Sequence, residues 1–462
     1  MRGHIGAQSG EAFRMMALYD VLLYEETNGD VTMRTAESLE SDDGLVWTLK
    51  IRDDITFTDG TPYDAEAVKF NWERIKDPAT KSPQLSSAAT IASMRVVDPL
   101  TLEITLTEVT GQFPRVVSRS LSAIGSPKAI QEKGERFGLE PVGAGPFVLK
   151  SFVENSETVL ERNPDYWDAP RPYLDELVLR YIGDDQQRTN ALLGGDLDLI
   201  HLTGLGPAKQ LVDAGWEHTK DMINGGRILV LNTTKPPFDD VRARQAVAYA
   251  IDWDDYNNVV EFGLGVPADT LFTEQSPFYE KDTKLPMGDP ERAQELFDEL
   301  AEENGGPLEF SLLAGEAVVG VGEYFITHFA KFDNVKVTVE PSAAAAVTPR
   351  VLEKDYEAVV HHVTQFLDPE PEMFNQFHSE STRNFSGIES TELDAALEKG
   401  RVSLDEDERA EAYADAQRIL AEEVPLAFYA RWQTFNFYAD DVKGVGTVND
   451  GMPLLWDIWI DG

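Results

Sequence analysis

The chain has 462 residues, 42% of them hydrophobic, so it can bury a large core, and its length suggests two to three domains. It carries 82 acidic against 40 basic residues, a formal net charge of -42. This charge argues against nucleic acid or an anionic membrane as a partner, because both require a basic surface. The chain has no cysteine, which excludes disulfides and zinc-thiolate sites. Neither a membrane-spanning run nor a signal peptide is visible.

The first half of the chain alternates between strand and helix patterns. A helical pattern begins at Phe13, and residues 64–74 form an amphipathic helix. Leu45, Trp47, Leu49 and Ile51 alternate with the residues at 46, 48 and 50 (Val, Thr and Lys), which is typical of a half-buried strand. The same reasoning predicts strands at 101–106, 147–150, 158–161 and 173–181, a helix at 186–193 and a further segment at 194–200.

A strand, a turn and a helix follow near the middle of the chain. Residues 227–231 are an apolar run suited to a buried strand, which Pro236-Pro237 prevents from continuing. Asp239 or Asp240 can cap the next helix and Phe238 can act as its hydrophobic staple. One face of that helix is small and apolar, with Ala243, Ala246, Val247, Ala250 and Ile251 at helical spacing.

The second half continues the alternation and ends in a tail. The apolar patterns predict helices at 290–302, 322–331, 391–400 and 405–423, and strands at 309–313, 335–340, 357–361 and 425–432. Alternating helices and strands indicate mixed α/β sheets.

Four stretches carry a family resemblance. Residues 231–252 read LNTTKPPFDDVRARQAVAYAID, and three further motifs occur in order at 47–68, 142–147 (VGAGPF) and 161–167 (ERNPDYW). Together they resemble the peptide- and nickel-type (family 5) solute-binding proteins of ABC importers, over nearly the entire chain.

The resemblance implies an α/β fold of the two-lobed periplasmic-binding-protein type (class II, cluster C), with mixed sheets, an accessory subdomain and two hinged crossovers. Lobe I is expected at 1–38, 141–232 and 436–462, its accessory subdomain at 39–140, and lobe II at 233–435. We expect the hinge at Asn232, Thr233 and Phe435. The family's opening strand is expected to be missing or shortened before residue 10.

The family delivers ligands to a membrane importer when its lobes close over them. The resemblance therefore implies an extracytoplasmic, monomeric receptor with a small-molecule or short-peptide ligand, permease subunits as partners and no cofactor. A secretion signal, often ending in a lipid-bearing cysteine that anchors the protein to the membrane, is expected ahead of residue 1.

Ligand-facing candidates cluster at 361–374, which resembles the family's Trp-Thr-x-Asp-x-x-Asp-Pro segment. His362 occupies the usual indole position, and Gln365 stands where peptide-binding members place an acidic residue for the ligand's amino group. An amide lacks the charge of that contact, so a neutral or differently charged ligand is favoured. The alternative is that the alignment is shifted or another carboxylate takes over. Phe366, Trp432, Tyr19 and Arg227 complete the predicted ligand-binding set.

Metal and enzyme sites have little support. Adjacent strand residues point to opposite faces, so His361 and His362 are not expected to share an ion, and we predict no metal site. A hydrolase that uses a carboxylate pair is the alternative of another class, but paired acids are common in so acidic a chain. A receptor of the same fold for an oligosaccharide, an opine-like compound or a metal chelate also stays open.

Overall fold

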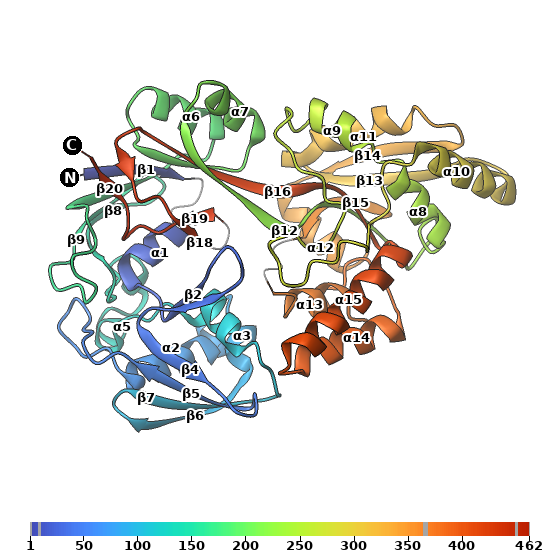
Figure 1. The fold of residues 1–462 in the computed structure, drawn as a ribbon. Helices are drawn as coiled ribbons and strands as arrows, with labels where there is room; N and C mark the ends of the chain where they lie inside the picture. The colour runs from blue at the N-terminus through green and yellow to red at the C-terminus, as the bar shows by residue number, and fades with distance from the viewer. Residues whose placement is uncertain (1, 8–10, 364–367, 449–450, 462) are drawn as a thin grey trace. The chain divides into compact units, whose positions relative to one another are not determined.

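A computed structural model describes residues 2–7, 11–363, 368–448 and 451–461 (Figure 1). The chain packs into two units, unit 1 with residues Met1–Asp221 and Thr434–Gly462, and unit 2 with Met222–Gln433. Both crossings between the units lie inside strands, β12 (Glu217–Leu231) and β16 (Leu426–Tyr438). The sequence placed these boundaries at 232 and 435, near the ends of the same two strands.

The main sheet of unit 1 has strand order β8-β9-β10-β1-β11, and the end of β16 pairs antiparallel with β11. β1 runs parallel to β10 and β11, while β8, β9 and β10 form an antiparallel meander. The bounds are β1 (Arg2–Ala7), β8 (Phe147–Val153), β9 (Glu157–Arg162), β10 (Glu176–Tyr181) and β11 (Leu199–Leu202). The helices of this region are α1 (Glu11–Tyr19), α5 (Pro127–Lys133), α6 (Asp185–Leu193) and α7 (Leu205–Asp213).

The expectation that the opening strand is missing or shortened is wrong, because β1 occupies an interior position of this sheet. Its sequence, RGHIGA, gives no strand signal, since two of its six residues are glycine. Tertiary packing supplies the reason for the glycine at position 3. A Cβ there would lie 2.9 Å from a methyl carbon of Leu174.

The glycines of the VGAGPF motif allow the chain to approach the end of α1. A Cβ at Gly143 would lie 2.1 Å from the carbonyl oxygen of Leu18, and one at Gly145 would lie 2.4 Å from that of Ala17. The Gly145 amide donates to the Leu18 carbonyl over 3.0 Å. Only glycine permits this backbone contact, so the glycines of the motif are required for its close packing against the end of α1 in unit 1.

A four-stranded antiparallel sheet of order β4-β5-β7-β6 forms a second layer of unit 1. Trp72 of α2 is fully buried in a core with Trp47, Leu49 and Phe113, and Asp64 caps the helix by accepting from the Ala67 amide. The bounds are β4 (Ala36–Glu40), β5 (Val46–Ile51), α2 (Ala65–Lys76), α3 (Leu85–Ala89), β6 (Ile91–Asp98), β7 (Thr101–Leu106) and α4 (Phe113–Val116). Short strands complete the unit: β2 (Leu23–Glu25), β3 (Val31–Met33), β17 (Val442–Lys443), β18 (Thr447–Val448), β19 (Met452–Pro453) and β20 (Trp459–Ile460).

Unit 2 is a three-layer α/β/α structure (Figure 1). Its sheet has order β14-β13-β15-β12, continued by β16, with β13 parallel to β14 and β15 and with β12 antiparallel to β15. One face is covered by α8, α10 and α11, and the other by α13, α14 and α15. The strands are β13 (Leu308–Gly315), β14 (Val335–Ser342) and β15 (Ala358–Val363). The helices are α8 (Val241–Tyr249), α9 (Trp253–Val259), α10 (Pro290–Asn304), α11 (Val319–Phe329), α12 (Ala344–Leu352), α13 (Glu372–Phe377), α14 (Thr391–Val402) and α15 (Glu406–Glu423).

The helix predicted after residue 239 is confirmed as α8. Asp240 caps it by accepting from the Arg242 amide over 2.8 Å, and Phe238 is fully buried against Phe310. In the described parts of the chain, none of the helices combines the length and apolarity that crossing a membrane requires.

Candidate functional site

A cavity of about 260 Å³ lies within unit 2 and brings together three residues predicted to bind ligand, Arg227, His362 and Trp432. Arg227 on β12 is the register partner of His362 on the antiparallel strand β15. Trp432 comes from β16, which neighbours β12 in the sheet. The apolar part of the wall is formed by Val318, Val321, Val347, Val360 and Tyr429.

The ring of Trp432 packs against both His362 and Arg227. Its ring centroid lies 5.3 Å from that of His362, and the guanidinium carbon of Arg227 lies 5.2 Å from the Trp432 ring. The indole is half-buried, so it remains accessible from the cavity. An aromatic face next to a cation at this distance is a favourable cation–π contact, which holds the two side chains in one arrangement.

Arg431, the residue before Trp432, positions this part of β16. Its buried guanidinium donates to the carbonyl oxygens of Gly225 over 2.8 Å, Thr270 over 2.6 Å and Leu271 over 3.0 Å. Burial lowers the pKa of Arg431 to about 10, with the charge of Asp269 opposing the shift. The arginine therefore ties β16, β12 and the loop at 270–272 together behind the cavity.

His361 and His362 have different neighbours beside β15: the ring centroid of His361 lies 5.5 Å from that of Phe385, and that of His362 lies 5.3 Å from that of Trp432. The expectation that His361 and His362 do not share a metal ion stays a prediction. Their ring centroids lie 5.1 Å apart with an interplanar angle of 17°, and both line the cavity. The reason is a local hydrogen bond of 2.8 Å between Nδ1 of His361 and the carbonyl oxygen of His362, which turns the His361 ring along the strand. No group of three or more potential metal ligands occurs among the residues described in the structure.

The cavity holds both imidazoles in their neutral form at pH 7. Desolvation, helped by the charges of His361 and Arg227, lowers the pKa of His362 to about 4. Desolvation also lowers the pKa of His361. Arg227 behaves differently. Desolvation lowers its pKa, but Glu261, Tyr256 and Tyr429 together outweigh this effect, so the pKa of Arg227 is raised. The stable positive charge of the cavity is therefore the Arg227 guanidinium.

Glu261 is a site residue that the sequence did not indicate, since it is one of 82 acidic residues without a motif. It follows α9, its side chain is 1% exposed, and its Oε1 lies 3.5 Å from Nη1 of Arg227. Burial raises the pKa of the Glu261 carboxyl against the charge of Arg227. Tyr429, also missed, sat inside the run predicted as a buried strand, and that strand assignment is confirmed.

The assignment of Tyr19, Gln365 and Phe366 to the ligand site stays a prediction. Tyr19 belongs to unit 1, at the end of α1, with its ring centroid 6.2 Å from that of Phe137. Gln365 and Phe366 lie outside the described residues. Asp368, which follows them, is fully buried and accepts from Arg409 over 2.7 Å.

The predicted hinge residues Asn232 and Thr233 lie within unit 2 rather than at the crossing between the units. Asn232 is fully buried, and its Nδ2 donates to the carbonyl oxygens of Lys354 and Tyr356 over 3.0 and 2.8 Å. These hydrogen bonds anchor the residue after β12 to the segment that precedes β15. Phe435 does lie next to a crossing, in unit 1, where its ring stacks on Phe437 at 5.7 Å.

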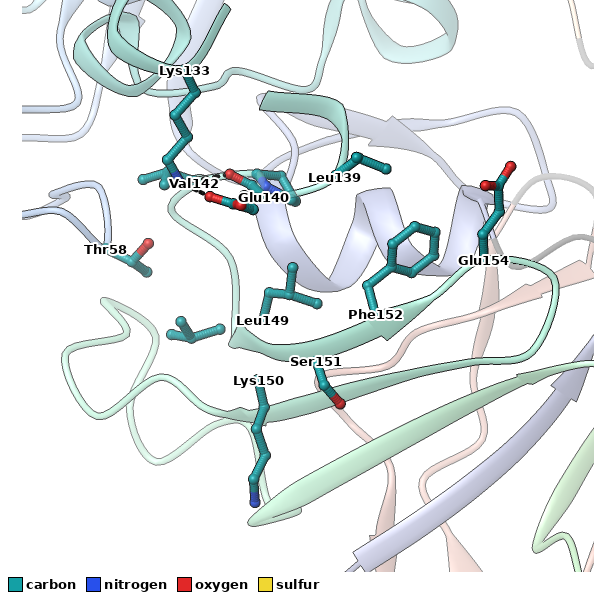
Figure 2. A pocket seen from close by; sticks show the side chains of 12 residues that line it. Thr58, Lys133, Leu139, Glu140, Val142, Leu149, Lys150, Ser151, Phe152 and Glu154 are labelled. Carbon is teal, nitrogen blue, oxygen red and sulfur yellow. Dashed lines mark hydrogen bonds and ion pairs between the residues drawn. The ribbon is translucent and has the colours of Figure 1, made fainter. Parts of the chain in front are cut away.

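A larger pocket of about 680 Å³ lies in unit 1 between α5 and β8 (Figure 2). Its two lysines are already paired with acidic residues. Lys133 Nζ lies 3.9 Å from a Glu140 carboxylate oxygen, and Lys150 Nζ lies 2.7 and 2.9 Å from Glu161 and Glu176. The described residues that line it include none of those predicted to bind ligand, whereas Arg227, His362 and Trp432 line the smaller cavity, which is therefore the better candidate.

Two comparisons place the sequence among known proteins. The family model of bacterial extracellular solute-binding proteins, family 5 middle region, matches residues 30–385. The glutathione-binding protein GsiB of Escherichia coli strain K12 is 31% identical over 266 residues, which cover 57% of this chain and 52% of GsiB. The match thus spans about half the length of this curated relative.

Solved structures resemble the fold over almost its whole length. The periplasmic binding protein DppA from Helicobacter pylori, in complex with the peptide STSA, superposes with a TM-score of 0.81 at 23% identity, covering 100% of this chain and 98% of DppA. NikA from Brucella suis, in complex with Fe(III)-EDTA, gives a TM-score of 0.87 at 23% identity, covering 97% and 95% of the two chains. This likeness confirms the predicted two-lobed α/β fold.

Proposed function

Because the chain belongs to the bacterial extracellular solute-binding proteins of family 5, we propose that it is an extracytoplasmic receptor that captures a small peptide or peptide-like ligand. The receptor passes the ligand, chemically unchanged, to the permease subunits of an ABC importer. It acts as a monomer and needs no cofactor.

The observation that carries this proposal is the clustering of Arg227, His362 and Trp432 around one cavity. These residues are far apart in the sequence and come from three different strands, yet they contact one another in pairs. A concave, mostly apolar pocket with a few convergent polar groups is the usual form of a small-molecule site. The arrangement offers stacking and hydrogen bonding, and the cluster contains no activated nucleophile.

The two strand crossings support a hinge mechanism. Each of β12 and β16 begins in one unit and ends in the other, so rotation about these two segments can change the arrangement of the units without breaking either core. We propose that a ligand held in unit 2 stabilises a closed form, which the importer recognises. The hinge then lies near residues 221 and 433.

The ligand class is tested by a thermal-shift screen of the purified protein against short peptides, N-acetylated peptides, oligosaccharides, opine-like compounds and metal chelates. A ligand at 100 times its Kd adds about 2.7 kcal/mol to the stability of the folded state, roughly 5 to 10 °C in Tm for a unit of this size. Peptides are expected to give such a shift. A shift confined to sugars, opines or chelates would overturn the peptide assignment.

Two tryptophan variants test whether the ligand-induced rise in Tm depends on the cavity of unit 2. Trp432→Ala is expected to remove the ligand-induced shift, because it deletes the stacking surface. Trp459→Ala, on the partly exposed strand β20 of unit 1, is the control and is expected to retain it. Loss of the shift in the control alone would place the site elsewhere.

A further inference from the structure

Among the described residues that line the cavity of unit 2, Arg227 is the one with a formal charge, and most of its neighbours in the wall are apolar. The two imidazoles of the cavity are neutral at pH 7, because desolvation lowers the pKa of both. Arg227 stays charged, and its side chain is 21% exposed, so the guanidinium can be reached from the cavity. A cation in this position attracts an anionic group, and the attraction is stronger here than at an open surface because less water surrounds it.

Glu261, the carboxylate next to Arg227, uses only part of the hydrogen-bonding capacity of the guanidinium. The closest approach to Glu261 is 3.5 Å, which is longer than a good charge-assisted hydrogen bond. Within the described chain, Nε of Arg227 and both carboxylate oxygens of Glu261 make no hydrogen bond. A guanidinium has five donors in a planar fork. A second carboxylate could therefore bind to Arg227 while Glu261 keeps its position beside it.

The remaining wall is apolar and limits the size of the group that fits. Val318, Val321 and Val347 come from the segment after β13 and from α12, and they face the cavity together with Tyr429 and Trp432. The volume of about 260 Å³ lies below the usual range of roughly 300 to 1,000 Å³ for whole drug-sized ligands. The cavity thus suits one end group of a longer ligand.

From this geometry we propose that the cavity of unit 2 selects a ligand end group that joins a carboxylate to an apolar side chain. The carboxylate binds the Arg227 guanidinium, and the apolar side chain packs between Trp432 and the valines. The C-terminal residue of a short apolar peptide has this chemistry, as does an N-acylated apolar amino acid. The inference rests on the proposed receptor function and makes it specific, since it requires no free amino group.

The test uses N-acetyl-Ala-Ala-Phe as a free acid and as its C-terminal amide, measured by titration calorimetry. One charge-assisted interaction corresponds to a loss of about 10- to 100-fold in affinity when it is removed. The acid is therefore expected to bind at least about tenfold more tightly than the amide. The same peptide ending in Ser in place of Phe is expected to bind more weakly, because it lacks the apolar group.

Substitutions test whether Arg227 causes the preference for the free acid over the amide. Arg227→Gln is expected to abolish the discrimination between acid and amide, whereas Glu261→Gln, which removes a competing carboxylate, is expected to strengthen binding of the acid. Since Arg227→Gln alone leaves Glu261 buried without its cation, the double variant Arg227→Gln/Glu261→Gln serves if the single one does not fold. Arg350→Gln, which removes a surface arginine paired with Glu340 and Asp355, is the matched control and should retain the discrimination.

The outcomes separate the two proposals. Equal binding of acid and amide, or discrimination that survives the loss of Arg227, overturns the end-group inference and leaves the receptor function standing. Binding of other ligands from the screen, but of neither peptide form, has the same consequence. If no ligand of any class binds, both proposals fail.

Discussion

Glu370 provides a pH-dependent test of how burial controls charge in unit 2. Its side chain is 7% exposed, and its Oε1 lies 3.3 Å from Nε of Arg401. Burial raises the pKa of the Glu370 carboxyl to about 8, although the charges of Arg401 and Arg409 act in the opposite direction. In an unfolded chain the same carboxyl titrates at its ordinary value of 4.5.

The sign of the effect follows from proton binding. Between pH 4.5 and 8 the folded protein holds a proton on Glu370 that the unfolded chain has released, so the contribution of Glu370 to stability is greatest below pH 4.5 and falls as the pH rises to 8. Each pH unit changes the free energy of unfolding by about 1.4 kcal/mol, which gives about 5 kcal/mol over the whole window. Glu370→Gln cannot ionise, so its stability relative to the wild type should increase by about this amount.

The assay is urea unfolding of the wild type and of Glu370→Gln from about pH 5 to about pH 9, followed by tryptophan fluorescence. The difference in unfolding free energy between them should be small at the acidic end and should grow steadily towards alkaline pH. Glu411→Gln, whose side chain is 73% exposed, is the control and should show no such growth. A difference for Glu370→Gln that stays constant across the range would refute the reasoning.

Three further substitutions test the packing around the site. Arg431→Lys replaces five donors with three and leaves buried carbonyl oxygens unpaired, so chemical unfolding should show a loss of about 2 to 4 kcal/mol; an unchanged stability would show that water replaces these bonds. Asp368→Asn breaks its buried pair with Arg409 and should cost about 3 to 5 kcal/mol in the same assay; a change below about 1 kcal/mol would contradict this. Gly143→Ala places a Cβ against the Leu18 carbonyl and should lower the Tm or the folded yield, whereas Gly306→Ala, with open space around its Cβ and no positive φ, should be milder.

The regular elements were predictable wherever one physical signal dominated. The strict alternation of apolar and polar residues at 101–106 marks β7 with the same bounds that the structure has, and the capped apolar stripe at 405–423 marks α15. The first half of β12 was missed because residues 217–221 are polar and mostly exposed, and because Gly225 and Gly226 weaken the strand pattern. Its pairing depends on tertiary contacts that a local pattern does not contain.

The site was predictable only in part. Arg227, His362 and Trp432 could be named because they lie in or beside motifs, but their mutual contacts depend on the register of β12 and β15 and on the position of β16. Glu261 carries no local signal, since its role arises from burial next to Arg227. The close approach of the two histidine rings carries no sequence signal either, since it accompanies a hydrogen bond between the His361 ring and the backbone carbonyl of His362.

The most direct test of the receptor function combines titration calorimetry with mass analysis of the same sample. The ligand that gives the largest thermal shift is titrated into the wild-type protein, and after prolonged incubation it is released by unfolding and weighed by mass spectrometry. A receptor predicts one ligand bound per chain and full recovery of the ligand with its mass unchanged. Progressive conversion of the ligand into smaller products, absent from a sample without protein, would contradict the account and identify a hydrolase.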